Sequence, residues 1–198
     1  MISPPVVVKF GGSLFGSPER QSLLRLAARA GAVLVPGGGP FADAVRDAQP
    51  ALAFGDGAAH AMAMLAMAQA AHLLHEAEPA LALCGDAPEI AAALARGEGA
   101  IWRPAALDVA PDLPASWDVT SDSLALWLAV ELRAARLMLL KSAAAEPSET
   151  FEALAERGVV DPCAPALARR FAGALEVIGP ATAAAFEAAL LRPSRRAA

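Results

Sequence analysis

The sequence has few of the residues that define several large classes of protein. Its 198 residues include only two cysteines, Cys84 and Cys163, which form no CxxC pair. Two cysteines are too few for the disulfide framework of a small secreted protein, so we expect reduced thiols and a cytoplasmic location. The N-terminal residues also lack the basic segment and the apolar run of a secretory signal, which favours the same expectation.

Positive charge is equally scarce. The formal net charge is −5 and the sequence pI is about 5.2. Because nucleic acids are bound by clustered basic side chains, nucleic acid is not an expected partner. Only two of the 16 basic residues are lysines, Lys9 and Lys141, and the others are arginines. Each lysine therefore needs an explanation of its own.

Long apolar runs are missing as well. Residues 58–74 carry no permanent charge, but His60, Gln69, His72 and many alanines make this stretch of about 17 residues a poor membrane span. We therefore expect no membrane association. We interpret the stretch as a helix that is buried or faces another subunit, and this predicts a homo-oligomer, at least a dimer.

The composition that remains is that of a well-packed globular protein. Hydrophobic residues make up 56% of the chain and charged residues 19%, which excludes a disordered chain. The length suits one domain with a substantial core. We predict a single domain over residues 1–198, with residues 191–198 as a frayed tail.

The first 50 residues follow a repeated pattern of strand, glycine loop and helix. Residues 6–10 form a β-branched run without polar alternation, which predicts a strand buried on both faces, and Gly11 and Gly12 end it. Ser17 is the expected N-cap of a helix that ends at Gly31. The pattern then repeats as a strand over residues 32–36, the loop Gly37–Gly39 and a helix over residues 40–49.

The rest of the chain predicts further strands and helices in alternation. The expected strands are 80–84, one or two short strands in 100–107 interrupted at Pro104, 136–140 and 174–179; the expected helices are 58–76, 87–97, 120–135, 149–157 and 181–191. Alternation of this kind indicates parallel strands with helical crossovers. The predicted fold is α/β, a three-layer αβα sandwich with a mainly parallel central sheet.

Both glycine loops are expected at the carboxyl ends of parallel strands, the edge where open α/β sheets bind ligands. Successive glycines let the backbone approach a ligand and turn several N–H groups toward an anion. Neither loop matches GxxxxGK[ST] or GxGxxG, so the common P-loop and dinucleotide sites are excluded. The loops could be tight turns alone, but a triple glycine between Pro36 and Pro40 is more than a turn requires.

The two lysines fall at the same predicted edge. Lys9 lies one residue before the end of an apolar strand, and Lys141 directly follows another. A lysine in this position can hold a phosphate as a point charge. Asp122, in the first turn of an apolar helix, could orient both lysines, or could serve only as a favourable charge at the helix N-terminus. The spacing alone leaves these two roles of Asp122 open.

The histidines and methionines give weaker signals. All three histidines lie in one predicted helix, and "HLLHE" matches neither HExxH nor HxxEH, so we expect no zinc site and no other resident metal. His60, which follows the loop "FGDG", is the histidine we consider for substrate contact. Met62, Met64 and Met67 are expected to be packing residues.

Taken in order, "VVKFGGS", "VPGGGPFAD" and "TSDSLALWLA" resemble the motifs of the amino-acid kinase superfamily, which includes aspartate, glutamate and uridylate kinases. A narrower similarity, carried by residues 56–74 with "TSDSLALWLA" and "LLK", is to the short branch that includes the aminomethylfuran phosphate kinases of methanofuran biosynthesis. The resemblance implies phosphoryl transfer from ATP, with Mg²⁺ carried in by the nucleotide, to a small phosphorylated acceptor. The expected reaction converts aminomethylfuran phosphate to its diphosphate in methylofuran biosynthesis.

The resemblance also implies roles for individual residues. Lys9 would stabilise charge on the transferring phosphoryl group, Lys141 would act beside it and contact ATP, and Asp122 would organise the two lysines. Gly11, Gly12 and Ser13 would hold the ATP phosphates. The acceptor would be held by Gly37, Gly38 and Gly39, with Asp56 and His60 close to its pocket.

Two departures from the superfamily pattern support an alternative. Ala143 and Ala144 stand where many relatives have an Asp-Gly pair that shapes the nucleotide loop, and the downstream glycine-rich segment with a further lysine is absent. A non-catalytic protein that binds a nucleotide or an oxyanion on the same fold is the second hypothesis. A structural subunit that uses the apolar helix as an oligomer interface is the third.

Overall fold

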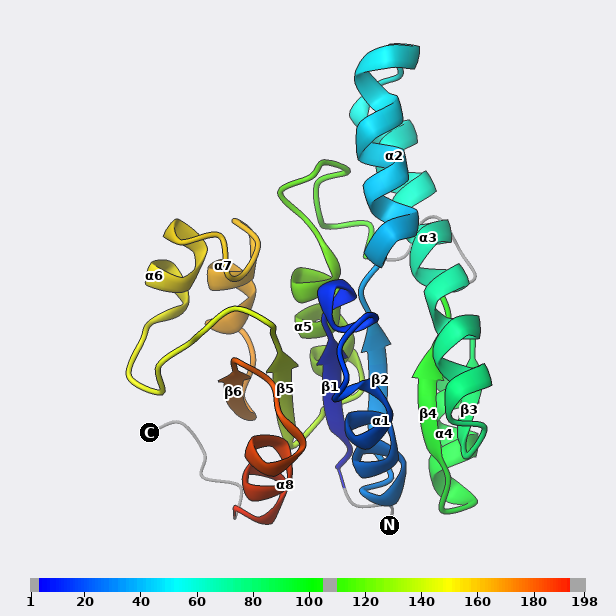
Figure 1. Ribbon diagram of the computed structural model, residues 1–198, viewed down its shortest axis with the longest axis vertical. Coiled ribbons are helices and arrows are strands. Elements are labelled where there is room, and N and C mark those ends of the chain that lie inside the picture. Colours follow the sequence, from blue (N-terminus) through cyan, green and yellow to red (C-terminus); the bar gives the residue numbers. More distant parts are fainter. Residues whose placement is uncertain (1–3, 105–109, 193–198) are drawn as a thin grey trace.

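The computed structural model describes residues 4–104 and 110–192, and its centre is one six-stranded sheet (Figure 1). The strands are β1 (Val6–Phe10), β2 (Val33–Pro36), β3 (Leu81–Cys84), β4 (Gly99–Trp102), β5 (Arg136–Leu140) and β6 (Ala174–Ile178). Their order across the sheet is β3-β4-β2-β1-β5-β6, and all neighbours are parallel. The predicted α/β fold with a mainly parallel sheet is confirmed.

Helices cover both faces of this sheet. They are α1 (Arg20–Arg29), α2 (Gly39–Leu52), α3 (Asp56–Ala77), α4 (Ala87–Ala95), α5 (Ser121–Glu131), α6 (Phe151–Glu156), α7 (Ala164–Ala168) and α8 (Ala183–Leu191), with a 3₁₀ turn η1 (Gly12–Leu14) after β1. One buried cluster joins α4, α5 and α7 to one face, and a second joins α1, α8 and the C-terminal half of α3 to the other. The layers are those of a three-layer sandwich.

The alternation of side chains along β1 decides which face each residue meets. Val8 and Phe10 pack in the cluster that contains α1 and α8, whereas Val7 packs in the cluster that contains α5. Lys9 has the same parity as Val7, so its side chain is directed to the α5 face. The strand register places Lys9 beside Val35 of β2 and Leu139 of β5, in the middle of the sheet.

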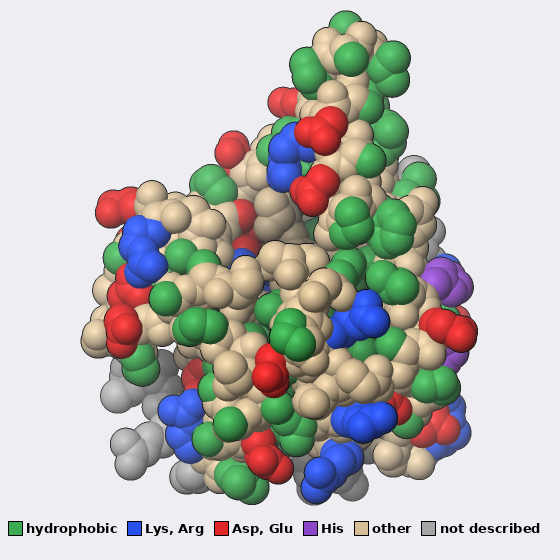
Figure 2. All heavy atoms as spheres, in the orientation of Figure 1, with side chains coloured by type: hydrophobic (Ala, Val, Ile, Leu, Met, Phe, Trp, Pro, Cys, Tyr) green, Lys and Arg blue, Asp and Glu red, His purple; other side chains and the backbone are tan. Residues whose placement is uncertain are grey.

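A helical hairpin extends beyond the carboxyl edge of the sheet. Helix α2 follows directly from the loop after β2 and packs along α3 (Figure 1). In the space-filling view this hairpin stands out from the body, and the surface is hollowed beside its base (Figure 2). None of the helices in the two described ranges has an apolar stretch of the length that a bilayer requires.

Several predicted boundaries were wrong. Helix α1 begins at Arg20, because the Ser17 hydroxyl accepts a hydrogen bond from the Glu19 amide in a preceding turn and does not cap the helix. Helix α5 ends at Glu131 and not near Ala135, because Arg133 adopts a left-handed conformation with φ of 48°.

Other differences concern shorter elements. Strand β4 covers Gly99–Trp102 and ends before Pro104, as one of the predicted strands in the 100–107 region; residues 105–107, like the predicted tail residues 193–198, lie outside the described residues. Helix α7 was not predicted, since five residues are too few for a helical period to emerge.

Candidate functional site

The two glycine loops lie backbone against backbone at the carboxyl edge of the sheet. A Cβ atom added to Gly12 would lie 2.6 Å from the backbone of Gly39, and one added to Gly37 would lie 2.6 Å from the Gly12 nitrogen. Gly39 also has a φ of 53°, which disfavours a side chain. The loops are therefore more than turns, because their contact requires glycine at these positions.

The amides of these loops divide into two groups. Gly11 donates to the Leu140 carbonyl and Gly37 donates to the Phe10 carbonyl, so these two amides hold the loops to the strand ends. Within the described ranges, the amides of Gly12, Ser13, Gly38 and Gly39 donate to no backbone or side-chain acceptor. Adjacent amides without an internal partner are suited to bind an anion.

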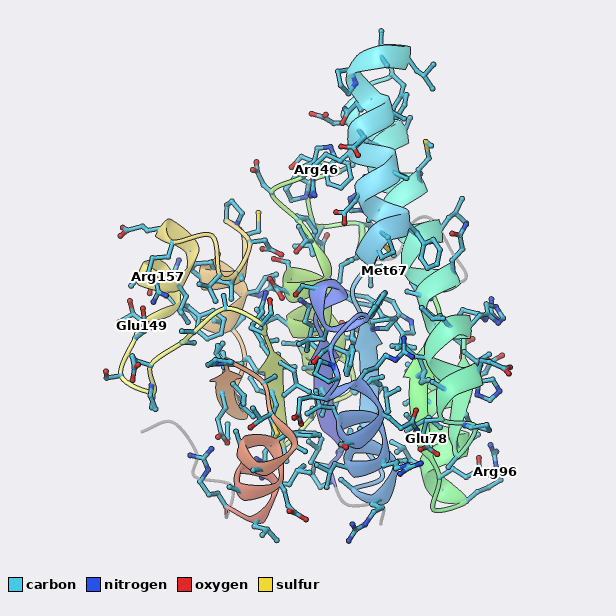
Figure 3. All side chains as sticks on the ribbon, viewed as in Figure 1. Arg46, Met67, Glu78, Arg96, Glu149 and Arg157 are labelled. Atoms are coloured by element: carbon cyan, nitrogen blue, oxygen red, sulfur yellow. The ribbon has the colours of Figure 1, made fainter. Side chains whose placement is uncertain are left out.

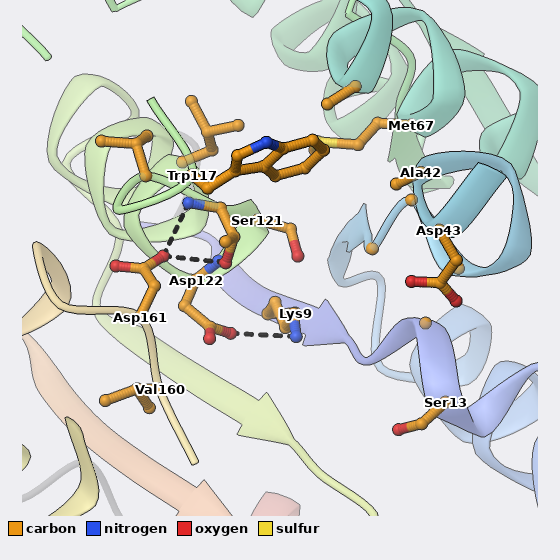
Figure 4. Close-up of a pocket in the computed structure, with 18 of the residues that line it drawn as sticks. Lys9, Ser13, Ala42, Asp43, Met67, Trp117, Ser121, Asp122, Val160 and Asp161 are labelled. Carbon is orange, nitrogen blue, oxygen red and sulfur yellow. Dashed lines mark hydrogen bonds and ion pairs between the residues drawn. The ribbon is translucent and has the colours of Figure 1, made fainter. Parts of the chain in front are cut away.

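Asp122 joins the two lysines. Its Oδ1 lies 2.9 Å from the Lys9 ammonium in an ion pair, and its Oδ2 accepts a hydrogen bond of 2.6 Å from the Lys141 ammonium. The side chains of Lys9, Asp122 and Lys141 are only 6%, 4% and 12% exposed. Lys9 comes from β1, Asp122 from the first turn of α5, and Lys141 directly follows β5, so three neighbouring elements meet at this cluster. Figure 4 shows the ion pair between Lys9 and Asp122.

The electrostatics of the cluster favour a bound anion. Burial acts to raise the pKa of the Asp122 carboxyl, but the two ammonium groups outweigh it and hold that pKa below its usual range. Burial, together with repulsion from Lys9, lowers the pKa of Lys141 to about 8. Two ammonium groups share one carboxylate, and buried ion pairs contribute little stability on balance. A surplus positive charge in a buried place is therefore better explained by ligand binding than by stability.

The glycine loops and the charged cluster line one cavity of about 530 Å³. Its lining includes Gly12, Ser13 and the Gly37–Gly39 loop together with Lys9, Asp122 and Lys141. Most of the residues that were predicted to form the site are thus brought together. His60 also lines the cavity, and burial lowers the pKa of its imidazole although its contact with the Ser116 backbone partly offsets this effect.

Two predicted site residues lie elsewhere. Asp56 is exposed in the first turn of α3, where it accepts a hydrogen bond of 2.9 Å from Gln49, and it does not line the cavity. Gly11 is also outside the lining, because its backbone packs against Leu140. Its role is to seat the loop on the sheet.

Sequence reasoning missed the wall of the cavity that faces α2. The Trp117 indole donates a hydrogen bond of 2.6 Å to Gln49, and the Arg46 guanidinium carbon lies 4.3 Å from the centre of the Trp117 ring. Arg46 extends from α2 toward the loop that carries Trp117 (Figure 3). Asp43, which also lines the cavity, lies 3.5 Å from Arg46. No local pattern marks these residues, since they meet only through the fold.

Asp161 was missed as well. It is 5% exposed and accepts hydrogen bonds from the backbone and hydroxyl groups of Thr120 and Ser123, and from the Ala164 amide. Figure 4 shows its carboxylate beside the first turn of α5, close to Asp122. The only signal in the sequence was an acid between the apolar pairs Val159–Val160 and Pro162–Cys163, which does not suggest a partner.

The segment after Lys141 closes against the first glycine loop. The Ser13 and Ser142 hydroxyls are 2.8 Å apart and share a hydrogen bond. Arg157 donates a hydrogen bond of 3.0 Å to the Ala144 carbonyl, and Ala145 pairs with Gly179. Ala143 and Ala144, which stand where the resemblance led us to expect an Asp-Gly pair, therefore lie in a loop that is fixed at Ala144 and Ala145.

In residues 4–104 and 110–192, no three His, Cys, Asp or Glu side chains are grouped so that they could hold a metal ion. Mg²⁺ is commonly bound through substrate phosphates and water, with few protein ligands.

The amino acid kinase family model matches residues 4–145, which include both glycine loops, Asp122 and Lys141. The chain belongs to the amino acid kinase family. Among curated proteins, none matches it.

Three solved structures have a similar fold over most of their length. Uridylate kinase from Archaeoglobus fulgidus is 20% identical with a TM-score of 0.71, and the match covers 94% of this chain and 95% of that one. UMP kinase from Ureaplasma parvum is 17% identical with a TM-score of 0.64, covering 89% and 90%. UMP kinase from Bacillus anthracis is 12% identical with a TM-score of 0.65, covering 89% and 87%. At these identities the likeness establishes the fold.

Proposed function

We propose that the protein transfers a phosphoryl group from ATP to a small phosphorylated acceptor. The observation that carries this proposal is the convergence of two touching glycine loops and the Lys9–Asp122–Lys141 cluster on one cavity. One loop supplies unpartnered amides beside the other, so two phosphate groups could be held next to each other with the lysines between them. Membership of the amino acid kinase family supports a kinase-type reaction.

The reaction requires positioning and charge stabilisation more than acid–base chemistry. An oxygen of the acceptor phosphate attacks the γ-phosphorus of ATP, a new P–O bond forms, and the bond to ADP breaks. That acceptor oxygen already carries negative charge near neutral pH, so no proton has to be removed. Asp122 is a poor base here, because both its oxygens contact ammonium groups and its pKa is lowered.

The two lysines are the groups that would stabilise the negative charge that develops on the transferring phosphoryl group. Lys9 and Lys141 stand on the two sides of Asp122, and a compact ammonium can contact the equatorial oxygens of a phosphoryl group as it moves. Asp122 keeps both amines in place before ATP arrives, which lowers the reorganisation required in the transition state. No covalent enzyme intermediate is involved.

ATP fits the first glycine loop. Gly12 and Ser13 offer free amides, and Ser13 and Lys141 both line the cavity. Mg²⁺ bound with ATP would neutralise charge on the β- and γ-phosphates.

For the acceptor we propose aminomethylfuran phosphate, which would be converted to its diphosphate in methylofuran biosynthesis. The residues on the α2 and α3 side of the cavity are consistent with a flat acceptor that carries one negative and one positive group. Arg46 can meet a phosphate, Asp43 can meet an ammonium group, and Trp117, Met64 and Met67 provide apolar surface for a small ring. Gly38, Gly39 and His60 border the same wall.

The test is to incubate the purified protein with MgATP and aminomethylfuran phosphate, and to follow ADP by a coupled assay and the diphosphate product by ³¹P NMR. UMP and a carboxylate such as aspartate serve as comparison acceptors. We expect a diphosphate signal with aminomethylfuran phosphate and far slower turnover with the others. If the folded protein forms no ADP with any phosphate or carboxylate acceptor, the proposed transfer is wrong.

The Ala143–Ala144 loop favours one alternative, a protein that binds a nucleotide or an oxyanion without turnover. Titration calorimetry separates the two functions. Tight binding of ATP with neither hydrolysis nor transfer supports the alternative, whereas binding followed by acceptor-dependent heat release supports the kinase.

A further inference from the structure

Asp161 is a buried carboxylate for which the proposed chemistry has no direct use. Five hydrogen bonds converge on it: Oδ2 accepts from the Thr120 amide at 2.9 Å, the Thr120 hydroxyl at 2.9 Å and the Ser123 amide at 3.0 Å, while Oδ1 accepts from the Ser123 hydroxyl at 2.5 Å and the Ala164 amide at 2.9 Å. In the described part of the chain it has no ion-pair partner.

These contacts replace an ordinary helix cap. Thr120 is the N-cap residue of α5, yet its hydroxyl is 3.5 Å from the Asp122 amide, which is a long and weak capping bond. The stronger bonds to the first turn come instead from Asp161, about 40 residues away in sequence. The first turn of α5 is therefore fixed by a charge on another segment.

That first turn carries Asp122, which lies between two of the residues that Asp161 binds, Ser123 and Thr120. The Asp122 contacts to Lys9 and Lys141 are 2.9 and 2.6 Å, so a small shift of the turn would break one of them. Residues 158–162, which include Asp161, also line the cavity. The cavity wall and the charged cluster are thus joined through one carboxylate.

We propose that Asp161 is a positioning residue that holds Asp122 in register with both lysines. A cap needed only for stability could be supplied by a local serine, aspartate or threonine, as Asp86 does for α4 through its 2.8 Å bond from the Glu89 amide. Asp161, which itself lines the cavity, instead accepts hydrogen bonds from the start of α5 and from the start of α7.

The test is possible because the chain has only two lysines, whose amine signals can be followed separately. Protein grown with ε-¹⁵N-lysine gives two side-chain amine signals, one each from Lys9 and Lys141, and Lys9→Arg assigns them. In the unsubstituted protein, burial and repulsion from Lys9 lower the pKa of Lys141 to about 8 although Asp122 opposes the shift, so we expect a titration midpoint in that region. In Asp161→Asn the Asp122 carboxylate is displaced and supports the ammonium form less. The Lys141 midpoint should then fall by roughly one pH unit, the lower range for an adjacent opposite charge.

Three further variants make the result decisive. Asp86→Asn, the same change at the cap of α4, should leave the lysine signals unchanged. Asp122→Asn should lower the Lys141 midpoint, and adding Asp161→Asn to it should have little further effect, because both act through the same carboxylate. If Asp161→Asn does not fold, Ser123→Ala removes only the 2.5 Å hydroxyl bond and should shift the midpoint in the same direction by less.

A lower melting temperature with unchanged lysine titration in Asp161→Asn, or in Ser123→Ala where that is the variant that folds, would overturn the proposal and leave Asp161 a structural cap. Only the kinetic part of the test rests on the proposed function. There, kcat should fall by roughly 10²-fold with little change in the KM for ATP. If the unsubstituted protein transfers no phosphate but the titration shifts as expected, the proposed function fails while the positioning role stands.

Discussion

At the scale of single residues, the central question is why a chain rich in arginine keeps lysine at two positions. Lys9 and Lys141 are buried around one carboxylate, and each presents a compact charge. A guanidinium is wider and planar, and it binds in a forked geometry. Because each ammonium group is buried against one oxygen of Asp122, we infer that the size of the residue matters as well as its charge.

Lys9→Arg should therefore preserve charge and fold but sharply reduce transfer. We expect kcat to fall by roughly 10²-fold or more, the scale of losing one donor to developing negative charge. Arg29→Lys, the reverse change at an exposed position, is the control and should leave kcat unchanged. Initial rates of ADP formation and melting temperatures would be compared. Turnover of Lys9→Arg near that of the unsubstituted protein would refute the assigned role.

The lowered pKa of Lys141 has a consequence for stability. Between about 8, its value in the folded protein, and 10.5, its ordinary value, the unfolded chain binds more protons at this residue. The contribution of Lys141 should therefore increase the free energy of unfolding as pH rises across that window, by up to about 1.4 kcal/mol per pH unit. Urea unfolding at pH 8, 9 and 10 measures the slope.

Lys141→Met is the comparison for this slope, because it removes the titrating amine and keeps a long side chain. The chain has no tyrosine, and its two cysteines are present in both proteins, so the difference in slope reports Lys141 together with its coupling to Lys9. Equal slopes in the two proteins would show that the Lys141 amine is not perturbed by burial.

At the scale of elements, the two glycine loops act as a pair. Each occupies space that a Cβ on the other would need, and together they bring unpartnered amides to one cavity. The first helix turns that follow, η1 and the start of α2, leave these amides directed away from internal acceptors. The proposed anion site is thus a property of two strand ends in contact and not of either loop alone.

Gly12→Ala should weaken ATP binding strongly, because the added Cβ would lie 2.6 Å from the Gly39 backbone and must push the loops apart. Gly16→Ala is a matched control, since a Cβ there meets nothing within 4 Å. Titration calorimetry with a non-hydrolysable ATP analogue should give at least a roughly tenfold loss for Gly12→Ala and no change for Gly16→Ala. Equal affinities would mean that the first loop does not hold nucleotide.

At the scale of the whole molecule, the apolar helix predicted over residues 58–76 is α3, which runs from Asp56 to Ala77. Its inner side is buried, but Met62, Leu65 and Leu73 are 39%, 51% and 38% exposed. Leu65→Glu should convert the expected oligomer to a monomer, because a charge cannot be buried in an apolar interface without a partner. Light scattering after size exclusion measures this. Leu191→Glu, at a leucine that is 81% exposed, should not change the mass.

Much of this molecule could be predicted from the sequence because its signals are local. Apolar strands followed by glycine predicted the parallel sheet. Lysines at strand ends predicted the charged cluster, since parallel strands bring their carboxyl ends to one edge. Asp161 and Trp117 could not be found in this way. Their partners lie 41 and 68 residues away, in Thr120 and Gln49, and only packing brings them together.

Asp56 is a residue that was predicted to lie at the site but does not reach the cavity. It was selected by motif, but it lies in the first turn of α3 with an exposed side chain, whereas His60, one turn further along the helix, reaches the cavity. A motif gives the segment that approaches a site, and helical geometry then decides which of its residues arrive there.

The order of strands in the sheet also bears on how the protein is made. The four strands β1 to β4 lie within the first 104 residues and form one side of the sheet, whereas β5 and β6 fill the other side later. A growing chain therefore carries both glycine loops while one flank of β1 is unpaired and Lys9 still lacks the carboxylate 113 positions downstream. Lys9 therefore has no Asp122 to pair with until α5 has emerged from the ribosome, so the candidate site can be completed only when the second part of the chain has folded onto the first.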